Sequence, residues 1–252
     1  MKRITILGIS NLPTEIKPGT DLGEAIVKAI SEDNEEILEK DIIVVSQSIV
    51  SKAEGRIVNL NNVTPSKIAI QYGKRLDKDP RLVELILQES NEIVRMGQKH
   101  LITENKLGVV CANSGIDRSN VPGKDNVTLL PRNPDASAAK IRRRIKELTG
   151  KNVAVIITDS VGRPLREGIV GIAIGTSGVS PLVDLRGRKD LYGYTLKSKI
   201  VAFADELASA ALLIMGEADE GIPVAVIRGA EYKFSDEPAE ILNRRPEKDL
   251  FR

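Results

Sequence analysis

The chain has 252 residues, of which 41% are hydrophobic, and its 37 basic and 35 acidic residues leave a formal net charge of +2. This length and composition allow a buried core in one large domain or two small ones. A nearly neutral chain has no field to hold a nucleic-acid backbone, and 3% aromatic residues without Trp give no stacking platform for single strands. Nucleic acid is therefore not an expected partner.

The N-terminal part of the chain predicts two strands and one helix. Residues Ile4 to Ile9 form an apolar stretch that is too short for a signal peptide and predicts a first strand. Asp21 predicts the N-cap of a helix through Ile30, and Ile42 to Val45 predicts a short apolar strand. No apolar run has the length of a membrane span, and the single cysteine excludes an intramolecular disulfide, so we expect a cytoplasmic protein that does not enter a membrane.

Farther along the chain, helical periodicity alternates with short apolar runs. Strands are expected at Leu107 to Ala112 and at Val153 to Ile157. Five glycines between Gly162 and Gly178 indicate tight turns or close backbone packing against a ligand or a second chain. The expected helices cover residues 65–72, residues 80–96, a segment from Asp135 or Ser137 to Leu148 that Gly150 closes, and a face from Val201 to Met215. This mixture, without a regular βαβ rhythm, predicts an α+β fold with mixed sheets and helices.

Three short glycine-bearing turns each present a carboxylate. The turns are residues 113–120 with Asp117, residues 158–163 with Asp159, and residues 215–221 with Glu217. Two of them follow expected strands and the third ends the last expected helix, where side chains can enter a cleft. For either aspartate alone, the capping of a turn or helix is the preferred interpretation. The three turns together favour a site for Mg²⁺ or Mn²⁺, which bind carboxylate and hydroxyl oxygens.

A polar segment after the second expected strand could hold a polyphosphate. Residues 46–56 carry several hydroxyls together with Lys52 and Arg56. A lysine supplies a compact positive charge, and backbone amides supply directed donors. Many exposed helix starts have a similar composition, and neither a Walker sequence nor a Gly-x-Gly-x-x-Gly fingerprint occurs, so any nucleotide site has another design. The single histidine and cysteine, His100 and Cys111, are interpreted as structural residues.

The chain resembles the coenzyme F420:L-glutamate ligases nearly end to end. The motifs that carry the resemblance are Leu12-Pro13, residues 51–56, residues 113–120, Ile156 to Asp159, residues 187–193 and Met215-Gly216-Glu217. The resemblance implies a GTP-dependent ligase that adds L-glutamate to the lactyl carboxylate of F420-0 and then extends the γ-linked chain. Because a carboxylate is a poor electrophile, we expect the reaction to pass through an acyl phosphate.

The resemblance also implies an architecture. It predicts a ligase-specific fold that forms an intertwined homodimer, and we expect the segment from Gly162 to Gly178 to contribute to the dimer contact. Residues 1–252 are expected to form a single ligase unit, which can be divided into two interleaved α+β subdomains. Because the chain ends at Arg252, we do not expect the nitroreductase-like domain that is fused to some relatives.

Roles for individual residues follow from the same resemblance. The implied ligands of two Mg²⁺ or Mn²⁺ ions, with K⁺ as a further candidate, are Asp117, Asp159, Ser160 and Glu217. The implied nucleotide contacts are Leu12, Pro13, Thr14, Glu15, Gln47, Ser48, Lys52, Asn120, Met215, Gly216, Glu217, Ala218, Asp219, Glu220, Gly221 and Ile222. The expected catalytic residues are Lys52, Asp117 and Asp159. Two alternatives stay open: a metal-dependent phosphohydrolase that activates water with the same carboxylates, and a nucleotide- or cofactor-binding sensor without turnover.

Overall fold

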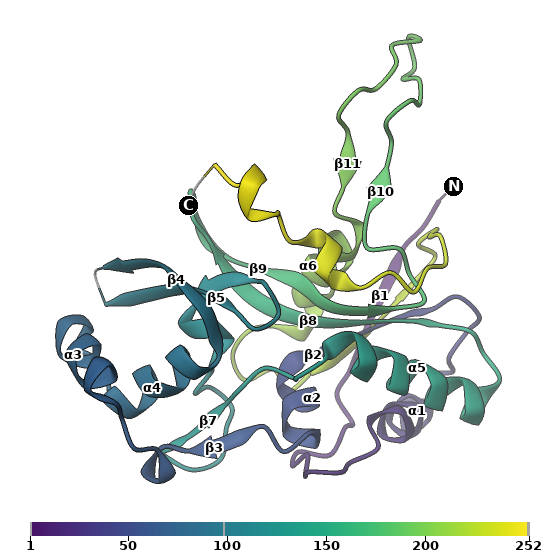
Figure 1. Cartoon of the computed structure of the whole chain (residues 1–252). Helices are drawn as coiled ribbons and strands as arrows, with labels where there is room; N and C mark the ends of the chain where they lie inside the picture. Colours follow the sequence, from purple (N-terminus) through teal and green to yellow (C-terminus); the bar gives the residue numbers. More distant parts are fainter. Residues whose placement is uncertain (1, 98, 251–252) are drawn as a thin grey trace.

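A five-stranded mixed sheet forms the centre of the computed structural model, which describes residues 2–97 and 99–250. The strand order is β1-β12-β2-β8-β9, and β2 and β8 are the parallel pair within it (Figure 1). The strands are β1 (Thr5–Ile9), β12 (Val224–Arg228), β2 (Ile42–Ser46), β8 (Ala154–Arg163) and β9 (Arg166–Ser177). The strands expected near Ile4, Ile42 and Val153 are confirmed.

Helices cover both faces of this sheet. Ile43 and Val45 of β2 pack with the helices of one face, whereas Ile42 and Val44 pack with the helix of the other face. Burial on both faces explains why β2 is a continuous apolar run and not an alternating one. The helices are α1 (Leu22–Glu32), α2 (Gln47–Ala53) and α5 (Pro134–Thr149) on the first face and α6 (Phe203–Met215) on the second.

A second group of elements, on the left in Figure 1, forms its own hydrophobic cluster. Leu60, Val83, Ile86, Leu101 and Val127 are fully buried within it. Its elements are β3 (Ile57–Asn59), η1 (Leu60–Asn62), α3 (Lys67–Leu76), α4 (Pro80–Gln88), β4 (Ser90–Gly97), β5 (His100–Asn105), β6 (Val110–Ala112) and β7 (Asn126–Thr128). Helices with mixed sheets confirm the α+β class. Whether the chain acts as one unit or as two interleaved subdomains stays a prediction.

A narrow hairpin of β10 (Val183–Asp184) and β11 (Ile200–Val201) extends away from the body of the molecule (Figure 1). The short 3-10 turns that remain are η2 (Asn113–Gly115), η3 (Ala239–Leu242) and η4 (Pro246–Lys248). Within residues 2–97 and 99–250, none of the helices has the length and apolar composition that crossing a membrane requires.

Capping residues set the helix ends, as the sequence indicates. The Asp21 side chain accepts a hydrogen bond from the Glu24 amide at the start of α1, which confirms the predicted N-cap. Gly150 ends α5 with a φ of +73°, a left-handed conformation that glycine adopts without strain. The N-cap of α5 is Asn133, one residue before the helix and earlier than expected, because Asp135 instead accepts bonds from the amides of Thr176 and Ala239.

The expected helix over residues 80–96 is wrong in its second half. Helix α4 ends at Gln88, and the chain then forms strand β4, which pairs with β5. Ser90 marks the change, because its hydroxyl donates to the Ile86 carbonyl and ties the end of the helix. Apolar residues at positions 82, 85, 86 and 93 match a helical period, but the last of them belongs to the strand.

Other element boundaries also differ from the expected ones, and the helix expected over residues 65–72 runs from Lys67 to Leu76. The strand expected from Leu107 is shortened to Val110–Ala112, because the Asn105 side chain accepts bonds from the Leu107 and Val109 amides and holds a turn there. The last helix begins at Phe203 and not at Val201, because Val201 pairs with Val183 in the β10–β11 hairpin.

The glycine-rich segment lies largely in strand β9 and packs closely against two helices. A Cβ atom at Gly171 would lie 1.9 Å from Leu212 Cδ1 and 2.8 Å from the Ala208 carbonyl oxygen, both in α6. A Cβ atom at Gly175 would lie 2.4 Å from the carbonyl carbon of Pro134 at the start of α5. The close backbone packing is confirmed, but the neighbours at these two positions are helices of the same chain and not the ligand or second chain that the glycines were expected to contact.

We predict that Gly171→Ala lowers the free energy of unfolding by about 1–3 kcal/mol, because α6 must move to admit the methyl group. Gly162→Ala is the matched control, since a Cβ atom there would meet nothing within 4 Å. The control should stay within about 0.5 kcal/mol of the wild type. Urea denaturation of both variants measures the difference, and equal stabilities would contradict the packing argument.

Candidate active site

The sheet topology brings four chain segments to one edge. Strands β2 and β8 are parallel, so Ser46 at the end of β2 lies beside Thr158. Strand β12 runs the other way and begins at Val224, which pairs with Ile9 at the end of β1. The loop after β1, the start of α2, the loop before β12 and the polar part of β8 therefore meet at the same edge.

A cleft of about 860 Å³ lies at this edge. Every residue to which we assigned a metal, nucleotide or catalytic role lines it, with the exception of Glu15. Glu15 is exposed and lies 3.8 Å from the ammonium group of Lys17. The structure thus brings together residues that the sequence separates by up to 210 positions, from Leu12 to Ile222.

Lys52 connects two walls of this cleft. Its ammonium group donates a hydrogen bond of 2.7 Å to the carbonyl oxygen of Asn120. The Asn120 side chain in turn donates to the carbonyl oxygen of Ala218, at 3.1 Å, in the loop before β12. Burial lowers the pKa of Lys52, while the negative charge of Asp117 opposes this shift. A partly desolvated cation therefore faces the cleft from the last turn of α2.

The tight turn η2 fixes the position of Asp117. Asn113 and Ser114 have left-handed φ values of 53° and 57°, which few residues other than glycine adopt. The Ser114 hydroxyl holds this turn through contacts of 2.7 Å with the Ser90 hydroxyl and 2.8 Å with the Thr103 hydroxyl. Beyond the turn, the Asp117 carboxylate accepts a 2.8 Å bond from the amide of Ser119.

Asp159 lies inside a strand and not in a turn. The expected turn of residues 158–163 is wrong, because β8 continues to Arg163 and pairs with β9 along this whole stretch. A register shift between Ile157 and Thr158 marks a bulge at the point where the buried part of β8 ends. Bulges of this kind redirect side chains beside functional sites. Asp159 and Ser160, the residues that follow, both line the cleft.

The electrostatic surroundings of Asp159 are unfavourable for its charge. Burial raises the pKa of Asp159 to about 7, and the negative charges of Asp117 and Glu217 act in the same direction. A hydrogen bond from the backbone amide of Ser160 opposes the shift. Asp117 and Glu217 are thus close enough to Asp159 to disfavour its charge, and a bound cation would relieve this repulsion.

The hydroxyls of the cleft already engage two of these carboxylates. The Ser160 hydroxyl donates to Glu217 at 2.7 Å, and the Ser119 hydroxyl donates to Asp117. In the part of the chain that the structure describes, no three side chains of His, Cys, Asp or Glu are arranged around a point that could hold a metal ion. The oxygen donors suit a hard divalent cation, but the carboxylates must move closer to one another to bind one.

Several residues of the cleft were not assigned a role from the sequence. The hydroxyl residues among them are Ser10, Ser46, Ser119 and Thr158. Ser10, Ser46 and Thr158 each directly follow an expected strand and Ser119 lies beside Asp117, and these positions are the signal that could have identified all four. Ile169 and Leu212 bring apolar surface from β9 and α6, and no sequence pattern connects these two residues to the site.

The interpretation of Cys111 as a buried structural residue is confirmed. The thiol is free and buried, and burial raises its pKa to about 12, so the reactive thiolate does not form near neutral pH. His100 begins strand β5 and lies outside the lining of the cleft. The chemistry of the cleft therefore depends on oxygen ligands and lysine.

The matching family model and the similar proteins below are all named as ligases of the same kind. The family model for F420-0:gamma-glutamyl ligase matches residues 12–229. A coenzyme F420:L-glutamate ligase of Methanothermobacter thermautotrophicus is 48% identical over 251 residues, which cover 99% of each chain. Ligases with the same name are 53% identical over 84% of both chains in Methanocaldococcus jannaschii and 46% identical over the full length of both in Methanopyrus kandleri.

The raised pKa of Asp159 gives a pH-dependent stability prediction. Because its pKa in the folded chain lies above the ordinary value of 3.8, the ionised carboxylate destabilises the fold at pH 8, and protonation relieves this as the pH falls through about 7. In EDTA, Asp159→Asn should raise the Tm at pH 8, and its advantage over the wild type should shrink by pH 5. Thermal scans test this, and a Tm difference that does not change with pH would contradict the assignment of the pKa.

Proposed function

The chain belongs to the F420-0:gamma-glutamyl ligase family, and we propose that it uses GTP to join L-glutamate to the lactyl carboxylate of F420-0 and to extend the γ-linked chain. One observation of the structure carries this proposal. A single cleft holds Lys52 together with Asp117, Asp159 and Glu217, and no histidine or cysteine nucleophile lines it. Such a site suits phosphoryl transfer, in which positioning and charge stabilisation supply most of the catalysis.

The reaction has two steps with balanced bonds. The acceptor carboxylate attacks the γ-phosphorus of GTP, which forms an acyl phosphate as the bond to the β-phosphate oxygen breaks and GDP leaves. The amine of glutamate then attacks the acyl carbon, loses a proton and displaces inorganic phosphate, which leaves an amide. Holding the two reactants in the cleft makes each step effectively unimolecular. No covalent bond to the protein is required.

Individual residues have separate roles in this proposal. Lys52 stabilises the charge that develops on the transferred phosphoryl group, and its bond to Asn120 keeps it aimed across the cleft. Asp117, Asp159, Ser160 and Glu217 hold two Mg²⁺ or Mn²⁺ ions, which neutralise phosphate oxygens when bound, and K⁺ is a further candidate cofactor. The other nucleotide contacts are Leu12, Pro13, Thr14, Gln47, Ser48, Asn120 and the loop from Met215 to Ile222, all of which line the cleft. Glu15, which lies outside the lining, is the weakest of the contacts implied by the resemblance.

Product mass is the direct test of the ligase. The protein is incubated with F420-0, L-glutamate, GTP and Mn²⁺, and the product should be heavier by one or more glutamate residues. Phosphate release should require both the acceptor and glutamate. Release from GTP alone would favour the phosphohydrolase, whereas GTP binding without any turnover would favour the sensor. A parallel series with ATP measures the preference for GTP.

We predict that Lys52→Ala lowers kcat/KM for GTP by about 10²-fold or more, the scale expected when one preorganised charge stabiliser is removed. The Tm of the Lys52→Ala variant should stay close to that of the wild type. Lys67→Ala is the matched control, because Lys67 is an exposed lysine of α3 that does not line the cleft. Steady-state kinetics and thermal scans of both variants separate the two effects. An unchanged kcat/KM in Lys52→Ala would remove Lys52 from the catalytic residues.

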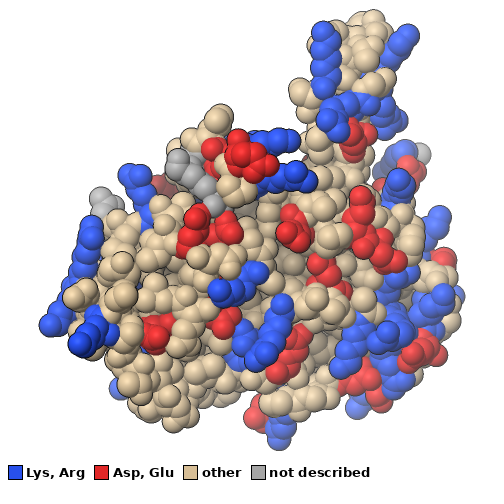
Figure 2. All heavy atoms as spheres, in the orientation of Figure 1, with Lys and Arg blue, Asp and Glu red and all other residues tan. Residues whose placement is uncertain are grey.

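We also propose that the protein acts as a homodimer. The β10–β11 hairpin projects from the body and carries basic side chains, as Figure 2 shows. Leu191 and Tyr192 in this hairpin are 99% and 95% exposed, which is unusual for two adjacent apolar residues of an isolated chain. Leu165, 76% exposed between β8 and β9, adds apolar surface from the glycine-rich segment that we expect at the contact. A second copy of this chain is the occupant that the family resemblance implies for these surfaces.

The dimer proposal makes a prediction about mass in solution. A Leu191→Ser/Tyr192→Ser variant should shift the protein from dimer to monomer in light scattering at micromolar concentration, because the apolar contact of the hairpin is lost. Ile68→Ser is the control, since Ile68 is 54% exposed on α3, far along the chain from the hairpin. A wild type that is monomeric at every concentration would contradict the proposal.

A further inference from the structure

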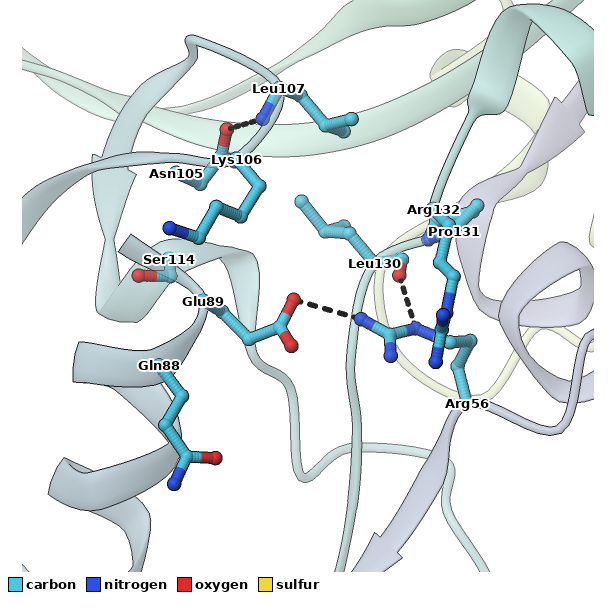
Figure 3. A pocket seen from close by; sticks show the side chains of 10 residues that line it. All are labelled: Arg56, Gln88, Glu89, Asn105, Lys106, Leu107, Ser114, Leu130, Pro131 and Arg132. Carbon is cyan, nitrogen blue, oxygen red and sulfur yellow. Dashed lines mark hydrogen bonds and ion pairs between the residues drawn. The ribbon is translucent and has the colours of Figure 1, made fainter. Parts of the chain in front are cut away.

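A second, smaller cavity lies on the other side of the η2 turn from the cleft. Its volume is about 250 Å³, and its lining residues are Arg56, Gln88, Glu89, Asn105, Lys106, Leu107, Ser114, Leu130, Pro131 and Arg132 (Figure 3). Within η2, Ser114 lines this cavity and the adjacent Gly115 lines the cleft. A Cβ atom at Gly115 would lie 2.6 Å from Leu130 Cδ1. Gly115 of the cleft and Leu130 of the smaller cavity are therefore in close contact, and the wall between the cleft and the cavity is thin here.

A fixed ion pair forms one wall of this cavity. The Arg56 guanidinium lies 2.8 Å from the Glu89 carboxylate, and its Nε donates to the Leu130 carbonyl oxygen at 3.0 Å (Figure 3). The side chains of Arg56 and Glu89 are only 14% and 25% exposed. These contacts hold the guanidinium in one orientation and neutralise the single carboxylate that lines the cavity.

Two further cations face the cavity without a carboxylate partner. Lys106 and Arg132 are exposed residues of its lining, and neither forms an ion pair with any residue within 2–97 or 99–250. The three cations Arg56, Lys106 and Arg132 against the one anion Glu89 leave the lining with a net charge of +2. A positively charged cavity of this size favours a small anion and is small for a whole nucleotide.

We propose that this cavity binds the carboxylates of glutamate units, either those of free L-glutamate or those of the γ-linked tail. The choice of glutamate as the ligand rests on the proposed ligase function, whereas the preference of the cavity for an anion rests on the charge of its lining. Planar guanidinium groups match a carboxylate in shape and can bind it with two parallel hydrogen bonds. Each γ-linked glutamate adds one α-carboxylate to the product, and a site with two unpaired cations beside the cleft is suited to receive it.

Calorimetric titration without nucleotide or F420-0 tests the proposal. The probes are L-glutamate, γ-L-glutamyl-L-glutamate and inorganic phosphate. At least one of the two glutamate probes should bind the wild type, and a Lys106→Ala/Arg132→Ala variant should bind it at least tenfold more weakly. Tighter binding of the dipeptide assigns the cavity to the tail, and tighter binding of glutamate assigns it to the incoming amino acid.

The control is a Lys140→Ala/Arg143→Ala variant, which removes the same charge from exposed residues of α5 outside both cavities. Its affinities should equal those of the wild type. Unchanged affinity in the Lys106→Ala/Arg132→Ala variant would overturn the proposal, as would a wild type that binds phosphate but neither glutamate probe. Both substituted residues are exposed, so the variant should fold, and the Tm verifies this.

The outcome does not depend on ligase activity. If the wild type forms the ligated product while the variant keeps its affinity for the probes, the cavity assignment fails and the ligase stands. If the variant loses the probes while the wild type forms no product, the ligase proposal fails and the anion site stands.

Discussion

The parallel pairing of β2 with β8 determines the geometry of the candidate active site. Its register places Ser46 beside Thr158, and this fixes the start of α2 against the polar end of β8. The core holds β2 from both sides, because Ile43 and Val45 are buried on one face and Ile42 and Val44 are buried on the other. A slip of one residue in this pairing would shift the start of α2, and with it Lys52, along β8 relative to Asp159.

The same edge of the sheet concentrates charge where water has limited access. Five carboxylates, among them Asp117, Asp159 and Glu217, line the cleft together with Lys52. Burial acts against the charged form of both Asp159 and Lys52. Opposite charges stabilise one another most strongly in such surroundings. The contacts from Lys52 to Asn120 and from Asn120 to Ala218 join helix α2 to the loops of Asn120 and Ala218. Divalent cations bound in the cleft would offset the negative charge that the carboxylates place there.

Local signals in the sequence predicted much of the fold, whereas the resemblance to a known family supplied most of the residues that line the cleft. The Asp21 cap, the Gly150 helix end and the apolar run of β2 depend on neighbouring residues, and each is confirmed. Two of the failures occurred where strand pairing within a hairpin overrides a helix or turn pattern. Residues 90–96 match a helical period but belong to β4, which pairs with β5. Asp159 was expected in a turn, but pairing with β9 extends β8 through Asp159 to Arg163. Ile169 and Leu212 enter the cleft only through tertiary packing.

A crystal structure of the protein with Mn²⁺ and a non-hydrolysable GTP analogue tests the central claim most directly. The claim is that the sheet edge forms one site for the nucleotide and the cations. We predict triphosphate density between Lys52 and the carboxylates of Asp117, Asp159 and Glu217, with Mn²⁺ bound to those carboxylates and the carboxylates closer to one another. Triphosphate density in the Arg56 cavity or outside the cleft, or Mn²⁺ bound elsewhere, would contradict the account.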